Sequence, residues 1–318
     1  MEWWTLYISL SVMMFLQYAA WGSWAPVLAG RLMGPLKMSG KQTGWIYGTL
    51  FLASIVMPLL AGQIVDRWVA TQWYLAGAHL AAGLLMLLAS RQRRFVPMMF
   101  VMGAYSLAFS ATIPLTTSLL FAHVGKLGEG ITFWVFVWIP VGWTLAGLGL
   151  TAWRRRAKKQ SEGQDCLILA GIVSLVMAAF CLLLPNTPPK GTSPDAVPFL
   201  DALSLLKDSQ FLLFMVISLL VTMQLQFYFL GTAPFLEHVG VSHKNVPAAM
   251  SIAQIAQIVA MLVLGVVLAG MGYRWLFVLG IMLWVVMYVC YAAEKPRWLV
   301  VSSMALHGLA YTFFINLG

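Results

Sequence analysis

Residues 247–270 read PAAMSIAQIAQIVAMLVLGVVLAG, a run without one charged side chain. A helix that crosses the hydrocarbon core of a bilayer needs about 20 mainly apolar residues, and comparable runs recur along the whole chain. The sequence therefore predicts an all-α, polytopic membrane protein with about ten spans. We place these spans at residues 4–30, 43–65, 70–90, 95–122, 131–153, 166–184, 210–236, 247–270, 273–292 and 297–318.

The composition of the chain agrees with this reading. Of its 318 residues, 61% are hydrophobic and 9% are charged, and the mean hydropathy is +0.86. A soluble domain carries about 25% charged residues. The composition excludes a soluble enzyme, a disordered chain and a secreted scaffold. It predicts a multi-pass membrane protein, for which we expect the cell (inner) membrane.

The charges and cysteines indicate few partners other than lipid. The net charge is +9, but the basic residues form short clusters between apolar runs, as at 154–159, which is the pattern of interfacial anchors and not of a nucleic-acid surface. Cys166, Cys181 and Cys290 are isolated and show no metal-ligand spacing. We expect no nucleic acid, no cofactor, no metal and a monomer.

One connection is long enough to divide the chain. Residues 185–208 hold a cluster of prolines among Asp and Lys, whereas the other connections are short. We predict an N-terminal bundle of six spans at 1–184, a cytoplasmic linker at 185–208, and an incomplete C-terminal bundle of four spans at 209–318. The faces that two missing spans would cover should be apolar and exposed.

Short repeated motifs support a duplication of the first half. Gln17-Tyr18 followed by Gly22-Ser23 matches Gln226-Phe227 followed by Gly231-Thr232, at an offset of 209 residues. A second match, between Arg67-Trp68 and Arg274-Trp275, has an offset of 207. Nearly equal offsets in the same order indicate a parallel repeat, which is common in transporters.

Several stretches resemble the nucleoside:proton symporters of the major facilitator superfamily. They are FLQYAAWGSW at 15–24, GQIVDRW at 62–68, LSLLKD at 203–208, MSIAQIAQ at 250–257 and LHGLAYTFF at 306–314. These matches are collinear over essentially the whole chain. The resemblance implies two six-helix bundles around a substrate cavity that opens alternately to each side of the membrane. It also implies that spans eleven and twelve are absent from this chain.

The orientation in the membrane has two conflicting indications. Fourteen Lys and Arg residues follow odd-numbered spans and five follow even-numbered ones, so the positive-inside rule predicts an external N-terminus. The resemblance implies an internal N-terminus, because Asp66-Arg67 stands where the family has a cytoplasmic loop. We adopt the family orientation as the working hypothesis.

A neutral nucleoside needs amide groups that donate and accept hydrogen bonds, and rings for stacking. Polar side chains within spans should face a cavity or another helix. By resemblance, Gln226 and Gln254 match substrate-holding glutamines, and His307 and Tyr311 match aromatic or polar site positions. The alternative is that such groups only join neighbouring helices. The full set of candidates is Gln17, Trp21, Trp138, Gln226, Gln254, Gln257, His307 and Tyr311.

The sequence departs from the family at the charged positions of this site. Phe136 stands where the family tends to carry an arginine, Gln257 and Thr312 where it carries acids, and Phe229 where it carries an asparagine. No Asp or Glu lies in the middle of a span, and the titratable mid-span groups are His79 and His307. Proton coupling needs a group that changes charge. We therefore predict transport that is weakly coupled or uncoupled to protons.

Three other readings stay open at this level. Ten spans also suit a drug/metabolite transporter built from two five-helix repeats, although the linker and the offsets argue against it. Glu237, His238 and His243 are the one cluster that a membrane enzyme could use. A diverged or truncated family member without transport activity is the third. The residues do not specify which nucleoside or related polar solute is carried.

Overall fold

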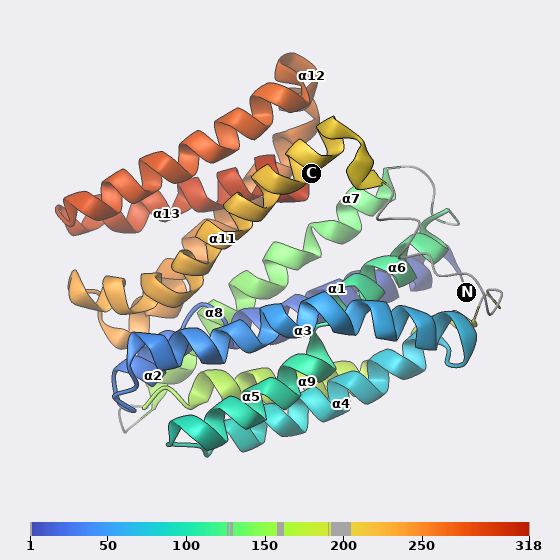
Figure 1. The fold of residues 1–318 in the computed structure, drawn as a ribbon, viewed down its shortest axis with the longest axis horizontal. Helices are drawn as coiled ribbons and strands as arrows, with labels where there is room; N and C mark the ends of the chain where they lie inside the picture. Colours follow the sequence, from blue (N-terminus) through green and yellow to red (C-terminus); the bar gives the residue numbers. More distant parts are fainter. Residues whose placement is uncertain are drawn as a thin grey trace.

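The computed structural model describes residues 2–125, 127, 130–157, 162–189, 191 and 205–317, and its regular structure in these ranges is helical (Figure 1). The predicted all-α class is confirmed. The elements are α1 (Trp3–Trp24), α2 (Leu28–Met33), α3 (Gly40–Arg67), α4 (Thr71–Ser90), α5 (Phe95–Phe109), α6 (Thr112–Val124), α7 (Ile131–Phe136), α8 (Trp138–Arg156), α9 (Asp165–Cys181), η1 (Leu205–Lys207), α11 (Ser209–His238), η2 (His243–Asn245), α12 (Val246–Ala293), α13 (Arg297–Tyr311) and η3 (Thr312–Asn316).

Seven helical stretches in the described ranges are long and apolar enough to cross a membrane. This number counts α12 once, although α12 covers two of the predicted spans. It leaves out α9, which has 17 residues, and α1, whose Ser, Gln and aromatic side chains lower its mean hydropathy. The count of ten spans therefore stays a prediction.

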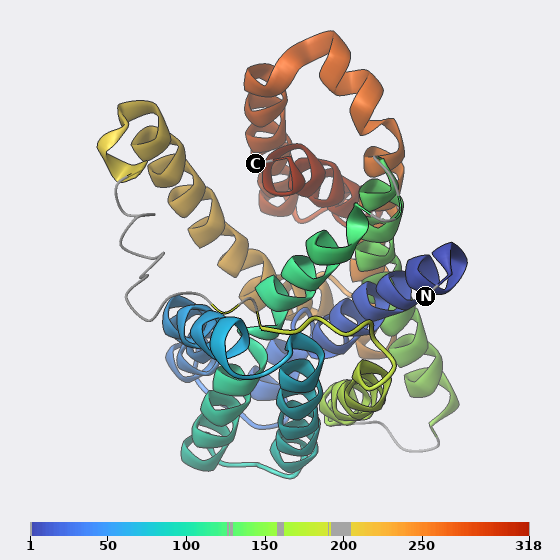
Figure 2. The ribbon, with the colours of Figure 1, turned by 90° about the vertical axis from the view of Figure 1, so that its right-hand side faces the viewer.

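The long helix α12 is bent back on itself at Gly272. A straight α-helix of 48 residues would extend about 72 Å, more than twice the thickness of a hydrocarbon core of about 30 Å. Gly272 has φ of 75° and ψ of 164°, a conformation that is essentially restricted to glycine. Figure 2 shows the arch, after which the second part of α12 runs beside α13.

The helices form two groups. Helices α1 to α9 make up the N-terminal half and α11 to α13 the C-terminal half. The halves converge where α2 contacts α11 and where α8 contacts the start of α12, at the left of Figure 1. Of the predicted linker at 185–208, residues 190 and 192–204 lie outside the described part of the chain. The division into two bundles with a linker stays a prediction.

The two halves touch at what we call the closed end, formed by residues 144–156 of α8 and residues 243–251. Arg154 binds Asp165 through two hydrogen bonds of 2.8 and 2.9 Å, and also donates to the His243 carbonyl oxygen at 3.2 Å. Arg155 donates to Asn245 Oδ1 at 2.7 Å. The N-terminal half thus holds the loop that joins α11 to α12.

Small residues let the backbones approach at the closed end. A Cβ added at Gly147 of α8 would collide with Ser251 Oγ and would lie 3.0 Å from the Pro247 carbonyl oxygen of α12. The Ala248 amide of α12 donates to Thr151 Oγ1 at 2.9 Å. The glycine at position 147 therefore fits this close approach of the halves without displacing Ser251.

Arg31 in α2 stabilises the N-terminal half at the same end. Its guanidinium is buried and donates to the carbonyl oxygens of Ser90 and Gln92, at 3.0 and 3.2 Å, and to Gln164 Oε1 at 3.2 Å. Burial lowers the pKa of Arg31.

Helix α11 is the least buried long helix of the C-terminal half. Leu213, Leu219 and Phe227 are exposed by 60%, 61% and 70%, and in Figure 2 α11 diverges from α12 and α13. Either lipid or further helices can cover such an apolar face. The expected incompleteness of 209–318 therefore stays a prediction.

Candidate functional site

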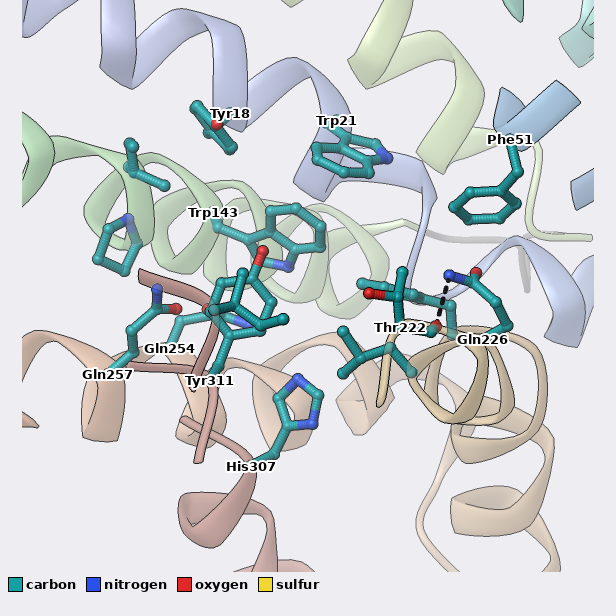
Figure 3. Close-up of a pocket in the computed structure, with 15 residues that line it drawn as sticks. Tyr18, Trp21, Phe51, Trp143, Thr222, Gln226, Gln254, Gln257, His307 and Tyr311 are labelled. Carbon is teal, nitrogen blue, oxygen red and sulfur yellow. Dashed lines mark hydrogen bonds between the residues drawn. The ribbon is translucent and has the colours of Figure 1, made fainter. Parts of the chain in front are cut away.

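A cavity of about 750 Å³, its opening included, lies between the two halves. Helices α1, α3 and α8 contribute one side, and α11, α12, α13 and η3 contribute the other (Figure 3). The cavity is lined by Tyr18, Trp21, Phe51, Ile139, Pro140, Trp143, Thr222, Leu225, Gln226, Phe229, Gln254, Gln257, His307, Tyr311 and Ile315.

Three glutamines bring amide groups to this cavity from different helices. Gln254 and Gln257 are three residues apart on α12 and so share a face, and Gln226 lies across the cavity on α11 (Figure 3). Gln226 Nε2 donates to the Thr222 carbonyl oxygen at 3.3 Å, while its Oε1 is buried without a protein partner. A buried polar atom of this kind normally has a partner, and a bound polar solute would supply one.

Three aromatic rings join the halves beside the amides. The Trp21 ring centroid is 5.4 Å from that of Trp143 and 6.5 Å from that of Phe229, and the Trp143 and Phe229 centroids are 6.0 Å apart. Gly22 makes this arrangement possible, since a Cβ there would lie 2.6 Å from Trp143 Cγ. Phe229, which replaces the asparagine expected from the resemblance, completes a hydrophobic surface on which a flat base can stack.

His307 reaches the cavity from α13, and its ring is held on two sides. The imidazole stacks on Tyr228 with centroids 3.6 Å apart and planes 12° apart. Trp284 Nε1 of α12 donates to His307 Nδ1 at 3.1 Å. Tyr311, one turn along α13, lines the cavity next to it (Figure 3).

The structure brings six of the eight predicted site residues together and places two elsewhere. Trp21, Gln226, Gln254, Gln257, His307 and Tyr311 line the cavity. Gln17 does not, because its amide is used inside the N-terminal half. Its Nε2 donates to Thr112 Oγ1 at 2.8 Å and its Oε1 lies 2.7 Å from His79 Nε2.

Trp138 is the second correction. Its side chain is 37% exposed and packs edge-on against Phe15, with centroids 6.4 Å apart. Trp143 instead of Trp138 lines the cavity. The two tryptophans are five residues apart on α8, which is about 140° around a helix, so only one of them can face the cavity with Ile139 and Pro140.

Sequence reasoning missed Tyr18, Phe51, Trp143 and Thr222 as lining residues. Helical spacing could have found two of them. Tyr18 is three residues before Trp21, and Thr222 is four before Gln226, so each pair shares a face. Phe51 carries no comparable signal, because it is one apolar residue among many on α3.

The cavity is uncharged over the residues that the structure describes. The lining contains no Asp, Glu, Lys or Arg residue, and its one histidine is His307. Phe136 packs on Phe121, with centroids 6.2 Å apart, and Thr312 Oγ1 donates to the Gly308 carbonyl oxygen at 3.0 Å. The described acidic residues lie at or beside helix ends; they are Glu2, Asp66, Glu162, Asp165, Asp208, Glu237 and Glu294.

Comparison with known proteins decides the family. The family model described as nucleoside H⁺ symporter matches residues 4–317. The chain belongs to the nucleoside H⁺ symporter family. This family consists of transporters and not of enzymes, so the predicted family and the prediction of a multi-pass membrane transporter are both confirmed.

Two relatives in this family are from Escherichia coli. The putative nucleoside transporter YegT is 32% identical over 316 residues, which cover 96% of this chain and 73% of the relative. The nucleoside permease NupG is 25% identical over 328 residues, which cover 97% of this chain and 77% of NupG. Both relatives thus match almost all of this chain.

A solved structure confirms the type of fold. The crystal structure of a NupG variant superimposes with a TM-score of 0.86 at 24% identity and covers 98% of this chain and 81% of that chain. The fold is therefore that of a transporter of the major facilitator type, and the five-plus-five architecture is wrong. The Oε1 atom of Glu237 is hydrogen-bonded to Nδ1 of His243 at 2.7 Å, beside the closed end. Within the described ranges no group of three His, Cys, Asp or Glu residues could hold a metal.

Proposed function

We propose that this protein carries nucleosides across the inner membrane by alternating access, through the cavity between its halves. The observation that carries the proposal is the convergence of three amides and three aromatic rings in an uncharged cavity. The names of the relatives, a putative nucleoside transporter and a nucleoside permease, agree with it.

The chemistry of the lining suits a neutral, flat and polar solute. Each glutamine amide can donate and accept, so Gln226, Gln254 and Gln257 can pair with ribose hydroxyl groups or with a base edge. The surface formed by Trp21, Trp143 and Phe229 can stack on the base. A nucleotide would bring a phosphate charge with no cation to balance it, and a charge at mid-membrane costs about 2.5–3.5 kcal/mol on insertion scales.

The closed end supplies the gate that alternating access requires. In this structure the hydrogen bonds of Arg154, Arg155 and Thr151 hold the halves together on one side of the cavity. For the substrate to leave on that side these contacts must break while the halves approach on the other. Rocking of two halves around a central site is the usual mechanism of such transporters.

We also propose that the movement is not driven by protons. An uncharged cavity has no carboxylate to take up and release a proton in each cycle. By the resemblance, Gln257, Thr312 and Phe136 stand in place of charges of opposite sign, so that no charge is left without its partner. The expected activity is equilibration of a nucleoside down its own gradient.

The test is uptake of labelled uridine and adenosine into proteoliposomes that contain the purified chain. We expect saturable uptake that unlabelled nucleosides inhibit and that uridine monophosphate does not. Gln226→Leu and Gln254→Leu should each reduce uptake at low substrate about tenfold, because a lost hydrogen bond leaves polar substrate atoms unpaired. The matched control is Gln224→Leu, two residues earlier on α11 and outside the cavity.

Two results would contradict the proposal. One is uptake no greater than that of empty liposomes by protein that is folded in detergent. The other is equal loss of uptake in the Gln224→Leu control and the two cavity variants.

A further inference from the structure

The hydrogen bond between Trp284 and His307 fixes where His307 carries its proton. An indole N–H can only donate. Since Trp284 Nε1 lies 3.1 Å from His307 Nδ1, Nδ1 must accept and carries no hydrogen. The neutral imidazole therefore has its hydrogen on Nε2, and a second proton on Nδ1 would require this bond to break.

The orientation of the ring is fixed as well. Tyr228 stacks on one face of His307 at 3.6 Å, and Trp284 packs against it at a centroid distance of 6.0 Å and an angle of 64°. Tyr228 and Trp284 are both buried. In Figure 3 the second ring nitrogen of His307 is directed into the cavity. The Nε2–H group thus points into the cavity.

His307 differs in this respect from the other polar groups around it. Amide and hydroxyl side chains, such as those of Gln254, Gln257 and Tyr311, can present either a donor or an acceptor. His307 can present only a donor while Trp284 holds it. A group whose polarity is fixed in advance selects for an acceptor and against a donor in the solute that faces it.

We propose that Trp284, which does not line the cavity, is a positioning residue that sets His307 as an Nε2–H donor to an acceptor atom of the substrate. For a nucleoside the acceptors are the carbonyl oxygens and unprotonated ring nitrogens of the base and the oxygen atoms of the ribose. The inference rests on the proposed nucleoside transport and adds a specificity determinant to the same cavity.

A double-mutant cycle on uridine uptake tests it. Trp284→Phe keeps an aromatic ring but removes the N–H, and His307→Phe keeps a ring but removes both nitrogens. We expect each to raise the KM about five- to tenfold, the effect of one hydrogen bond. The double variant should be no worse than His307→Phe alone, because Trp284 acts through His307. Trp275→Phe, at an exposed tryptophan of α12, is the matched control and should leave the KM unchanged.

The cycle has two contradicting outcomes. An unchanged KM in Trp284→Phe would overturn the inference. A rise in KM in the double variant equal to the product of the two single rises would also overturn the inference. It would show that Trp284 acts independently of His307, by packing alone.

The ¹⁵N spectrum of histidine-labelled wild-type protein gives an independent readout, which does not depend on the folding of Trp284→Phe. The signals of His307 are assigned by their loss in His307→Phe. A protonated Nε2 with an unprotonated Nδ1 supports the inference, and the opposite tautomer or an imidazolium overturns it. Absence of uptake by the wild type would refute the proposed function instead, while the spectrum would still decide the state of His307.

Discussion

The closed end and the cavity join the same two halves in opposite ways. At the closed end Arg154 is paired with Asp165 and with the His243 carbonyl oxygen, so its charge is balanced and its donors are used. In the cavity the amide oxygen of Gln226 is buried without a protein partner. A bound polar solute can supply the partner that this amide oxygen lacks.

The two membrane-embedded histidines differ in their surroundings: the Nδ1 atom of His79 is buried inside the N-terminal half without a partner, away from the cavity. His79 lies inside the N-terminal half, where its Nε2 is 2.7 Å from Gln17 Oε1. His307 has one nitrogen held by Trp284 and the other directed into the cavity. The two residues look alike in sequence, and only the packing separates a structural histidine from one that faces a substrate.

The largest expected effect comes from preventing closure. Gly147→Val places a side chain where Ser251 and the Pro247 backbone now lie, so the closed end cannot form and uptake should fall to the level of empty liposomes. Gly149→Val, two residues later on α8, meets nothing within 4 Å and should transport normally. Equal activity of the two variants would show that the closed end plays no part in transport.

The next effect is on stability. Asp165→Ala leaves the Arg154 charge buried without its partner, and breaking a buried ion pair in this way costs about 3–5 kcal/mol. The exposed pair Arg93–Glu162 is the control, because Glu162→Gln should cost less than about 1 kcal/mol. Thermal unfolding in detergent measures both. A smaller loss of stability in Asp165→Ala than in Glu162→Gln would contradict this prediction.

The smallest effect separates packing glutamines from cavity glutamines. Gln17→Leu leaves His79 and Thr112 without their partner, so we expect a loss of about 1–3 kcal/mol in stability with an unchanged KM for uridine. Gln254→Leu should raise the KM for uridine and leave the stability unchanged. Melting temperatures and uptake kinetics on the same preparations check this, and a raised KM in Gln17→Leu would return that residue to the site.

Much of the fold could be predicted from the sequence because membrane helices leave a direct signal in hydropathy. The helical class and the transporter family were both readable from composition and motifs. Gln254 and Gln257 could be predicted because polar residues three apart in an apolar helix have few places to point. The bend of α12 at Gly272 could not be predicted, because a glycine between two apolar runs is also typical of a short loop between two helices.

Other features depend on contacts between distant segments. Gln17 and Gln226 occupy matching positions in the repeat, yet the first meets His79 and Thr112 whereas the second meets the cavity. The bond between Arg154 and the His243 carbonyl oxygen joins residues 89 apart in the chain. Hydropathy and spacing describe single helices, so they do not encode which helices face each other.

The central claim is that a nucleoside crosses through an uncharged cavity without proton coupling. The direct measurement is uridine uptake into proteoliposomes with equal uridine on both sides and an imposed inward proton gradient. We expect no net accumulation, and normal equilibration when a uridine gradient alone is imposed. Concentrative uptake that the proton gradient drives, and that His307→Ala abolishes, would contradict the account and assign the coupling role to that histidine.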